Sequence, residues 1–288
     1  MLLLSYFCLV EFLKNIFKAY INSSVHVAGA VCAFLGITAL EFTIPVSNDL
    51  LGFVFFGTIT GYNFVKYAEV IRTRFKELWG YLKVVQIVSL LALIYFAFQL
   101  SFETLLVTGG FAMLTFFYAI PFLKNKNLRN FTGLKISIVA VVWAGVTVLV
   151  PIVNEGFDLV PITIGIEVWI SFIQRFLFVF VLTLPFEIRD LQFDKLALGT
   201  LPQRVGIRKT KTIGIILLFV LLLLECLKTI KYLEFEISMI VSVVVLGLFL
   251  LYSKRSQSKY YASFWVESIP ILWLLILYVL QNYLFISF

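Results

Sequence analysis

The sequence predicts an all-α integral membrane protein with nine transmembrane helices around a central cavity that opens to the cytoplasmic side. Composition is the first observation, since 61% of the residues are hydrophobic, 14% are charged and the mean hydropathy is +1.03. A soluble domain of 288 residues does not use that much apolar surface. The second observation is that apolar runs of about 20 residues recur along the whole chain, each long enough to cross roughly 30 Å of hydrocarbon.

These runs are expected to be helices, because backbone polar groups in lipid must be satisfied within each segment. We place the nine spans near 23–41, 49–66, 84–101, 103–120, 133–151, 161–184, 212–231, 236–253 and 265–286. No second, polar domain is evident. Residues 1–288 are therefore expected to form a single transmembrane domain.

Residues 1–21 differ from the spans that follow. Lys14 and Lys18 share one helical face, while leucine and phenylalanine fill most of the remainder. This pattern is typical of an interfacial helix leading into the first span. A signal peptide is the alternative, but no basic residue precedes the apolar stretch and Glu11 interrupts it.

The basic residues predict the orientation in the membrane. Of the 23 Lys and Arg residues, 20 lie on one side. They fall in the N-terminal segment, in the loops after the second, fourth, sixth and eighth spans, and at the start of the fifth span. The opposite side has only Lys228 and Lys231, and Arg175 lies inside a span. The positive-inside rule then places the N-terminus in the cytoplasm and the C-terminus on the opposite side of the membrane. We expect this membrane to be a bacterial-type inner or plasma membrane. The net charge of +7 thus reflects topology, and we expect no nucleic-acid partner.

Two of the cytoplasmic loops, about 67–83 and 187–211, are too long to be simple connections. Long loops in a compact protein are often functional. Each contains a pattern compatible with a further short helix. We expect both to cap the cavity.

Three carboxylates follow the sixth span. Glu187, Asp190 and Asp194 are spaced i, i+3 and i+7, which puts them on one face of a helix. Aligned carboxylates with basic residues nearby suit a hard divalent cation that holds a phosphate. The alternative is a set of ordinary interfacial ion pairs with neighbouring basic residues such as Arg189 and Lys195.

This stretch resembles the second aspartate-rich motif of the UbiA-type intramembrane prenyltransferases. That motif reads D-x-x-D-x-x-x-D and is followed, after a short gap, by G-x-x-T-L-P. Here the corresponding residues are Glu187, Asp190 and Asp194, then Gly199-Thr200-Leu201-Pro202, with Gly206 in the following turn. The glycine departs from the family's spacing, since it directly precedes the threonine. A second segment, with Tyr118, Pro121 and Lys124, is similar to the family's Tyr-x-x-Pro-x-x-Lys stretch after the fourth helix.

The first motif of the family is only partly present. It reads Asn-x-x-x-Asp-x-x-x-Asp at the end of the second helix. Here Asn63 is present, but Tyr67 and Ile71 occupy the aspartate positions, with Lys66 and Glu69 nearby but out of register. The resemblance implies that the two motifs hold Mg²⁺ against the diphosphate of an isoprenyl donor, so half of the expected ligands are missing.

The resemblance covers essentially the whole chain and implies nine helices around a cytoplasmic-side cavity. It implies Mg²⁺-dependent transfer of an isoprenyl group from a prenyl diphosphate to a hydrophobic or aromatic acceptor. Asp190 and Asp194 would hold Mg²⁺, and Glu187 would assist. One alternative is a catalytically lapsed homologue that binds isoprenoid lipid or acts as a partner subunit. Another is a transporter, for which paired broken helices or related halves are expected; neither is evident.

Four further residues are candidates for the same site. Asn63 and Lys66 would face the carboxylates, Lys124 would neutralise the diphosphate, and Tyr118 would line the cavity. Each also has an ordinary reading. Asn63 is equally explained as a helix cap or a hydrogen bond between helices. Lys66 and Lys124 are equally explained by topology, and Tyr118 by a position at headgroup level.

Two charged residues within predicted spans complete the analysis. Arg175 lies well inside a predicted span, and we expect it to face inward in a structural role, since an unpaired arginine there costs at least about 2.5 kcal/mol. Glu267 lies early in the last span. It suits either the mouth of the cavity or the N-terminus of a helix, where the macrodipole favours a carboxylate, and we prefer the latter. The single histidine and three cysteines form no zinc-binding or disulfide pattern.

Overall fold

The computed structural model describes residues 2–74, 80–120, 134–156, 162–192, 199–229 and 231–285, and within these ranges the chain forms helices and no strand. The helices are α1 (Leu2–Asn22), α2 (Val25–Phe42), α3 (Asn48–Arg74), α4 (Gly80–Ala97), α5 (Phe102–Ala119), α6 (Leu134–Ala144), α7 (Val150–Asn154), α8 (Ile162–Asp190), α9 (Leu201–Glu225), α10 (Leu233–Tyr252) and α11 (Ile269–Phe285). Two π-helices, η3 (Gly145–Leu149) and η5 (Tyr261–Val266), join α6 to α7 and precede α11.

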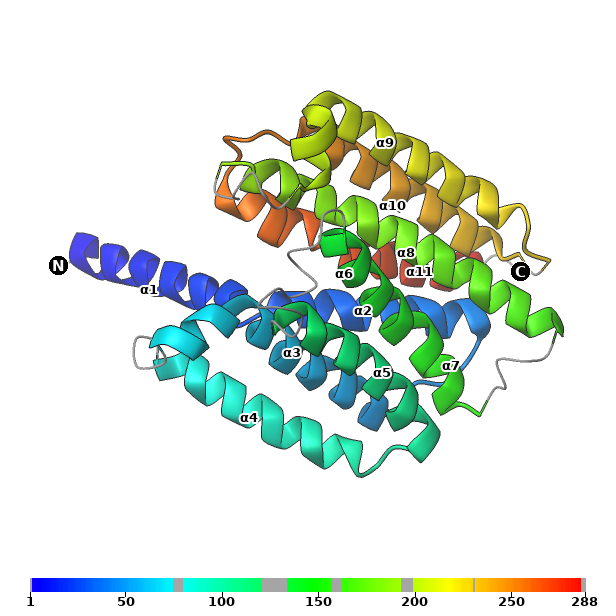
Figure 1. Ribbon diagram of the computed structural model, residues 1–288, viewed down its shortest axis with the longest axis horizontal. Coiled ribbons are helices and arrows are strands. Elements are labelled where there is room, and N and C mark those ends of the chain that lie inside the picture. The colour runs from blue at the N-terminus through cyan, green and yellow to red at the C-terminus, as the bar shows by residue number, and fades with distance from the viewer. Residues whose placement is uncertain are drawn as a thin grey trace.

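The long helices pack in a closed ring. Neighbouring contacts run from α2 to α3, α5, α6, α8, α9, α10 and α11, and α11 packs against α2 again. α4 packs against α3 (Figure 1). We call the end of the ring at which α2 begins, α8 ends and α9 begins the basic end, because Lys66, Lys135 and Arg204 lie there. It is on the left in Figure 1.

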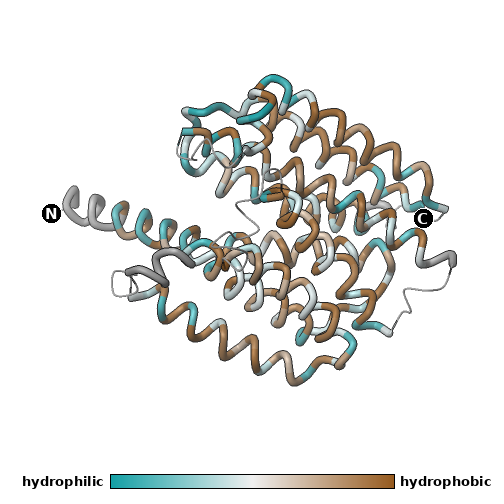
Figure 2. The backbone as a smooth tube through the Cα atoms, viewed as in Figure 1, coloured by the Kyte–Doolittle hydropathy of each residue, from teal (hydrophilic) through white to brown (hydrophobic). Residues whose placement is uncertain are grey.

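Within the described ranges, seven helices are long and apolar enough to cross a membrane, when the continuous pairs α6–α7 and η5–α11 are each counted as one. They coincide with seven of the nine spans expected from the sequence. The other two expected spans fall on α3 and α9, which are helical over 27 and 25 residues but carry more polar side chains. Apolar residues cover most of the helix surfaces, and hydrophilic residues gather near the ends (Figure 2). An integral membrane protein follows from these helices.

Aromatic side chains fill the middle of the ring. Phe34 of α2 lies within 6.2 Å, between ring centroids, of Trp143, Phe178 and Trp273 from three other helices. Arg175 is buried in this core, where it donates to the carbonyl of Phe34 at 2.8 Å, and its guanidinium lies 4.2 Å from the centre of the Phe34 ring. The expected inward-facing structural arginine is therefore confirmed, with a carbonyl and aromatic faces in place of a carboxylate.

α1 projects away from the basic end of the bundle, with the N-terminus at its far end (Figure 1). Only its last turns contact the ring. Phe17 packs edge-on against Tyr260 and Phe264, each at 5.1 Å between ring centroids, and the hydroxyl of Tyr20 lies 2.9 Å from Nδ1 of His26. Phe12 and Ile16 remain exposed. An interfacial position for residues 1–21 stays a prediction.

Candidate functional site

Two of the second-motif carboxylates, Glu187 and Asp190, lie on the last turn of α8 at the basic end. Glu187 is buried, with 4% of its side chain exposed, and its Oε1 lies 2.8 Å from Nζ of Lys135 on α6. Asp190 is about a quarter exposed, and its Oδ1 accepts a hydrogen bond from Nε of Arg189 at 2.8 Å. Asp190 uses only part of its acceptor capacity in its pair, because an ionised carboxylate offers about four lone-pair sites.

A small cavity of about 60 Å³ lies beside Glu187. Its polar lining is formed by Lys135, Glu187, Thr200 and Arg204. Lys135 and Arg204 contribute positive charge, and the N-terminus of α9 adds the positive end of its dipole. The lining therefore has the features of an anion site. The volume is below the roughly 300–1,000 Å³ of typical ligand pockets, so a prenyl chain needs additional space.

The glycine-threonine-leucine-proline segment determines where α9 begins. Gly199 adopts a φ of +54°, which favours glycine. The backbone N–H of Thr200 donates to Oε1 of Gln203 at 3.0 Å, as in a capping box. Pro202 lies in the first turn, where its missing N–H costs nothing. These residues fix the first turn of α9, which lines the cavity through Thr200, Leu201 and Arg204.

The helix that carries the incomplete first motif is tied to the junction of α1 and α2. Asn63 is buried; its Oδ1 accepts from Oγ of Ser24 at 2.7 Å, and its Nδ2 donates to the carbonyl of Ser23 at 3.1 Å. One turn later, Nζ of Lys66 lies 3.2 Å from the carbonyl of Asn22. The amide of Asn63 thus forms hydrogen bonds between α3 and the α1–α2 junction. A hydrogen bond between helices was one of the two structural explanations of Asn63 that the sequence left open.

Tyr67, at the first missing aspartate position, belongs to the same junction. Its hydroxyl donates to the carbonyl of Asn22 at 2.9 Å, and burial raises its pKa to about 12. The tyrosine therefore stays neutral at physiological pH. Lys66 and Tyr67 together satisfy carbonyl groups that the end of α1 would otherwise leave without partners. At the position where the resemblance implies a metal ligand, the chain thus has a tyrosine that makes a contact between α3 and the end of α1.

A third group of polar residues lies between α3 and α11. Glu267 is buried, and its Oε1 accepts a hydrogen bond from the hydroxyl of Tyr62 at 3.4 Å. Lys66 and Arg189 are close enough to Glu267 to interact with it electrostatically, and Tyr118 of α5 interacts in the same way with Tyr62. Arg189, which also binds Asp190, therefore links the carboxylate end of α8 electrostatically with the turn that precedes α11.

Several predicted site residues lie outside the described part of the chain. Asp194, Pro121 and Lys124 fall in the ranges 193–198 and 121–133, and the side chain of Glu69 is likewise not described. The same ranges immediately precede Gly199 and follow α5. The predicted roles of Asp194 and Lys124 stay predictions. Lys135, Arg189 and Arg204 enter the site in the structure, although the sequence presented them only as residues that set topology or form ion pairs.

The donor set suits Mg²⁺ only in combination with a phosphate. Among the described residues no three His, Cys, Asp or Glu side chains gather into a metal cage. Mg²⁺ does not require such a cage, because it keeps several waters and is commonly held by one or two carboxylates together with substrate phosphates. Asp190, with its spare lone pairs and partial exposure, and Glu187 meet this requirement.

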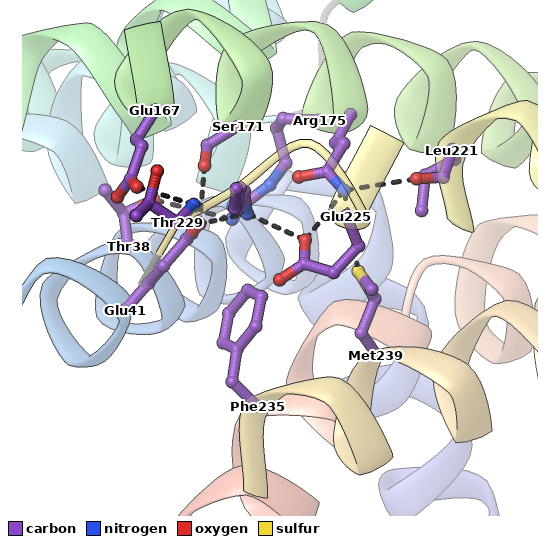
Figure 3. Close-up of polar contacts among 12 residues, drawn as sticks. Thr38, Glu41, Glu167, Ser171, Arg175, Leu221, Glu225, Thr229, Phe235 and Met239 are labelled. Carbon is purple, nitrogen blue, oxygen red and sulfur yellow. Dashed lines mark hydrogen bonds and ion pairs between the residues drawn. The ribbon is translucent and has the colours of Figure 1, made fainter. Parts of the chain in front are cut away.

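A second polar cluster lies at the other end of the ring (Figure 3). Nζ of Lys228 lies 2.6 Å from Oε1 of Glu41 and 2.9 Å from Oε2 of Glu225, and all three side chains are at least nine-tenths buried. Ser171 donates to Glu41, and Gln174 donates to Glu225 at 2.9 Å. We call these five residues the opposite-end cluster. Its charged groups satisfy one another, which indicates a structural role.

Among the comparisons with known proteins, the one with solved structures supports the fold. No family model and no curated protein sequence matches this chain. Among solved structures, the chain is similar to a UbiA homologue from Archaeoglobus fulgidus bound to GPP and Mg²⁺. The TM-score is 0.55 at 15% identity, and the match covers 90% of this chain and 98% of the other. The arrangement of helices is thus that of the UbiA fold, as the motifs predicted.

Proposed function

We propose that this protein is a membrane prenyltransferase that transfers an isoprenyl group from a prenyl diphosphate to a hydrophobic or aromatic acceptor. The observation that carries the proposal is the position of the second motif. On a fold shared with a protein that binds GPP and Mg²⁺, Glu187 lines a cavity together with Lys135, Arg204 and the start of α9, and Asp190 follows Glu187 by three residues at the end of α8. This combination of carboxylates, cations and helix N-terminus suits a diphosphate with a divalent ion.

In this proposal the acidic residues bind the metal ion and the basic residues contact the diphosphate of the donor. Asp190 and Glu187, together with Asp194, would hold Mg²⁺, which would supply positive charge against the diphosphate. Lys135 and Arg204 neutralise phosphate oxygens as the donor carbon–oxygen bond breaks and negative charge grows on the leaving group. Lys66 adds a further positive charge from α3. This charge would replace the metal ion that the two aspartates of the family's first motif would hold. Loss of the diphosphate leaves an allylic carbocation, and the apolar surroundings exclude water from it.

The same proposal includes the membrane setting. The basic end faces the cytoplasm of a bacterial-type inner or plasma membrane, because nearly all Lys and Arg residues outside the spans belong to it. A water-soluble prenyl diphosphate would then reach the site from the cytoplasm, while a hydrophobic acceptor would enter from the bilayer. The N-terminus lies on the cytoplasmic side and the C-terminus on the other.

A second candidate function, isoprenoid binding without turnover, is favoured by one observation. Asn63 and Tyr67, at first-motif positions, make their hydrogen bonds to the α1–α2 junction. If these contacts persist during turnover, the first motif supplies no metal ligand, and only the carboxylates of the second motif are left to bind Mg²⁺. A lapsed enzyme would bind a prenyl diphosphate and leave it intact.

The variant Asp190→Ala tests the proposal. Purified protein in lipid nanodiscs is titrated with geranyl diphosphate at increasing Mg²⁺, and consumption of the diphosphate is followed in parallel. We expect wild-type binding to require Mg²⁺ and Asp190→Ala to weaken it at least about tenfold, since the carboxylate would hold the Mg²⁺ that the donor phosphates share. Asp49→Ala, which changes a carboxylate at the first turn of α3, serves as the control and should bind as the wild type does. Equal binding by Asp190→Ala would contradict the proposal, and binding without consumption would support the lapsed enzyme.

A further inference from the structure

The last turn of α8 follows a proline. Pro185 lies inside the helix, shortly before the helix ends at Asp190. Proline has no backbone N–H, so the carbonyl of Val181 loses its helical hydrogen bond, and helices commonly bend at such a position. The direction of the last turn, which carries Glu187 and Asp190, therefore depends in part on contacts with other segments of the protein.

The two carboxylates of this turn are supported differently. Glu187 pairs with Lys135 at 2.8 Å, and this ion pair ties it to a second helix, α6. Asp190 pairs with Arg189, its neighbour in the chain, and such a pair cannot hold the turn against another helix. The side chain of Asp190 is also the more exposed of the two. The position of Asp190 therefore relies on the backbone around it.

One loop holds this backbone on both sides. Residues 253–260, which join α10 to η5, lie against the end of α8. In this loop, Nε2 of Gln257 donates a hydrogen bond to the carbonyl of Pro185 at 3.0 Å. The carbonyl of Arg255 accepts a hydrogen bond from Nε2 of Gln192, in the turn after α8. One contact precedes the two carboxylates and the other follows them, so together they bracket the segment.

The loop is itself fixed in place. Oε1 of Gln257 accepts from the backbone N–H of Lys254 at 3.0 Å, so both the oxygen and the nitrogen of this amide are engaged. At the start of the loop, Nζ of Lys211 on α9 donates to the carbonyls of Leu251 and Ser253 at 2.7 and 2.8 Å. A lysine in this position satisfies carbonyls that the end of α10 leaves without helical partners. The loop is thus anchored to α9 and can support the end of α8.

We propose that Gln257 and Gln192 are positioning residues for Asp190, and that through them the loop at 253–260 sets how tightly the site holds Mg²⁺. This inference rests on the proposed function. Mg²⁺ demands nearly ideal octahedral geometry, so a small displacement of one carboxylate weakens its binding. Both glutamines act through the backbone and need not touch the ion or the donor.

The variant Gln257→Met tests the assignment, because it keeps the length of the side chain, adds no charge and removes both hydrogen bonds of the amide. Wild type and variant in nanodiscs are titrated with Mg²⁺ at a fixed concentration of geranyl diphosphate. The half-saturating Mg²⁺ concentration and the temperature of unfolding are measured. We expect the half-saturating concentration to rise about tenfold, as is typical when a residue that orients a metal ligand is lost. Binding at saturating Mg²⁺ and the unfolding temperature should stay close to the wild type.

Two further variants show whether the effect passes through Asp190. Gln192→Met removes the other hydrogen bond and should change the Mg²⁺ requirement in the same direction. Adding Gln257→Met to Asp190→Ala should raise the requirement no further, because effects that act through one residue are not additive. Gln99→Met, an exposed glutamine in the connection between α4 and α5, is the matched control and should behave as the wild type does.

The measurements separate the ways in which the assignment can fail. A wild-type Mg²⁺ requirement in both Gln257→Met and Gln192→Met would overturn it, and the proposed function would stand if Asp190→Ala still weakens binding. Weaker binding at every Mg²⁺ concentration, together with a lower unfolding temperature, would also overturn it, because the loop would then serve the fold in general. An additive effect in the double variant would have the same meaning. If the wild type binds geranyl diphosphate equally well without Mg²⁺, the assignment and the proposed function both fail.

Discussion

At the scale of single residues, the Lys135–Glu187 pair shows how closely stability and function are combined. Nζ of Lys135 and Oε1 of Glu187 are 2.8 Å apart, and the carboxylate is buried. Removing one member of such a pair leaves an uncompensated buried charge, whereas removing both often costs little. Glu187 therefore contributes to the fold even before any ion or diphosphate binds.

This reasoning gives a prediction for the pair. Lys135→Met should lower the free energy of unfolding by about 3–5 kcal/mol, because Glu187 is left buried without its cation. The double variant Lys135→Met, Glu187→Leu should recover most of that loss. Thermal unfolding in detergent measures both, with the exposed Lys231→Met as a control. A double variant no more stable than the single one would show that the pair does not act as a unit.

At the scale of elements, α9 depends on one glycine. Gly206 has φ +81° and ψ 162°, and this backbone conformation separates the first turn of α9 from the rest of the helix. The region is essentially restricted to glycine. A Cβ added at Gly206 would meet no atom within 4 Å, so a substitution here tests the backbone alone. The first turn carries Thr200 and Arg204 into the cavity, which makes the kink part of the site.

We therefore expect Gly206→Ala to lower the free energy of unfolding by about 1–3 kcal/mol and to weaken diphosphate binding, since the strained conformation must relax. Gly109→Ala is the matched control. That glycine lies in the middle of α5 and also has open space around its Cα, so alanine there should be neutral or stabilising by up to about 1 kcal/mol. Thermal unfolding of the two variants compares them directly, and equal stability would exclude strain at Gly206.

At the scale of the molecule, the sequence predicted the helices better than it predicted the site. Hydropathy and the need to satisfy backbone groups determine where apolar helices form, so spans such as 103–120 agree with α5 within a residue or two. Side-chain partners depend on packing between distant segments. Nothing local indicates that Asn63 binds Ser24, or that Lys135, which reads as a topology signal, pairs with Glu187. Glu267 likewise resembles an ordinary helix-start carboxylate until Tyr62 is placed beside it.

The opposite-end cluster joins α2, α8 and α9 across the ring. Its lysine, Lys228, is the basis of a prediction about the pH dependence of stability. Burial alone would lower the pKa of Lys228, but the carboxylates of Glu41 and Glu225 outweigh this effect and raise it above its usual 10.5. A raised pKa in the folded state means that the stabilisation is complete below the unfolded value and disappears as the pH rises through the folded value. The wild-type protein should therefore lose stability as the pH passes about 10.5.

Lys228→Met removes this cation and leaves two buried carboxylates facing each other. We expect a loss of about 3–5 kcal/mol in the free energy of unfolding at neutral pH, and a weaker dependence on pH above 10.5 than in the wild type. Lys231→Met, an exposed lysine in the same connection, should change neither quantity. Thermal unfolding on both sides of pH 10.5 measures the two effects together. If Lys228→Met and Lys231→Met unfold alike, the cluster does not hold α2, α8 and α9 together, and packing of the aromatic core around Phe34 must hold that end of the ring instead.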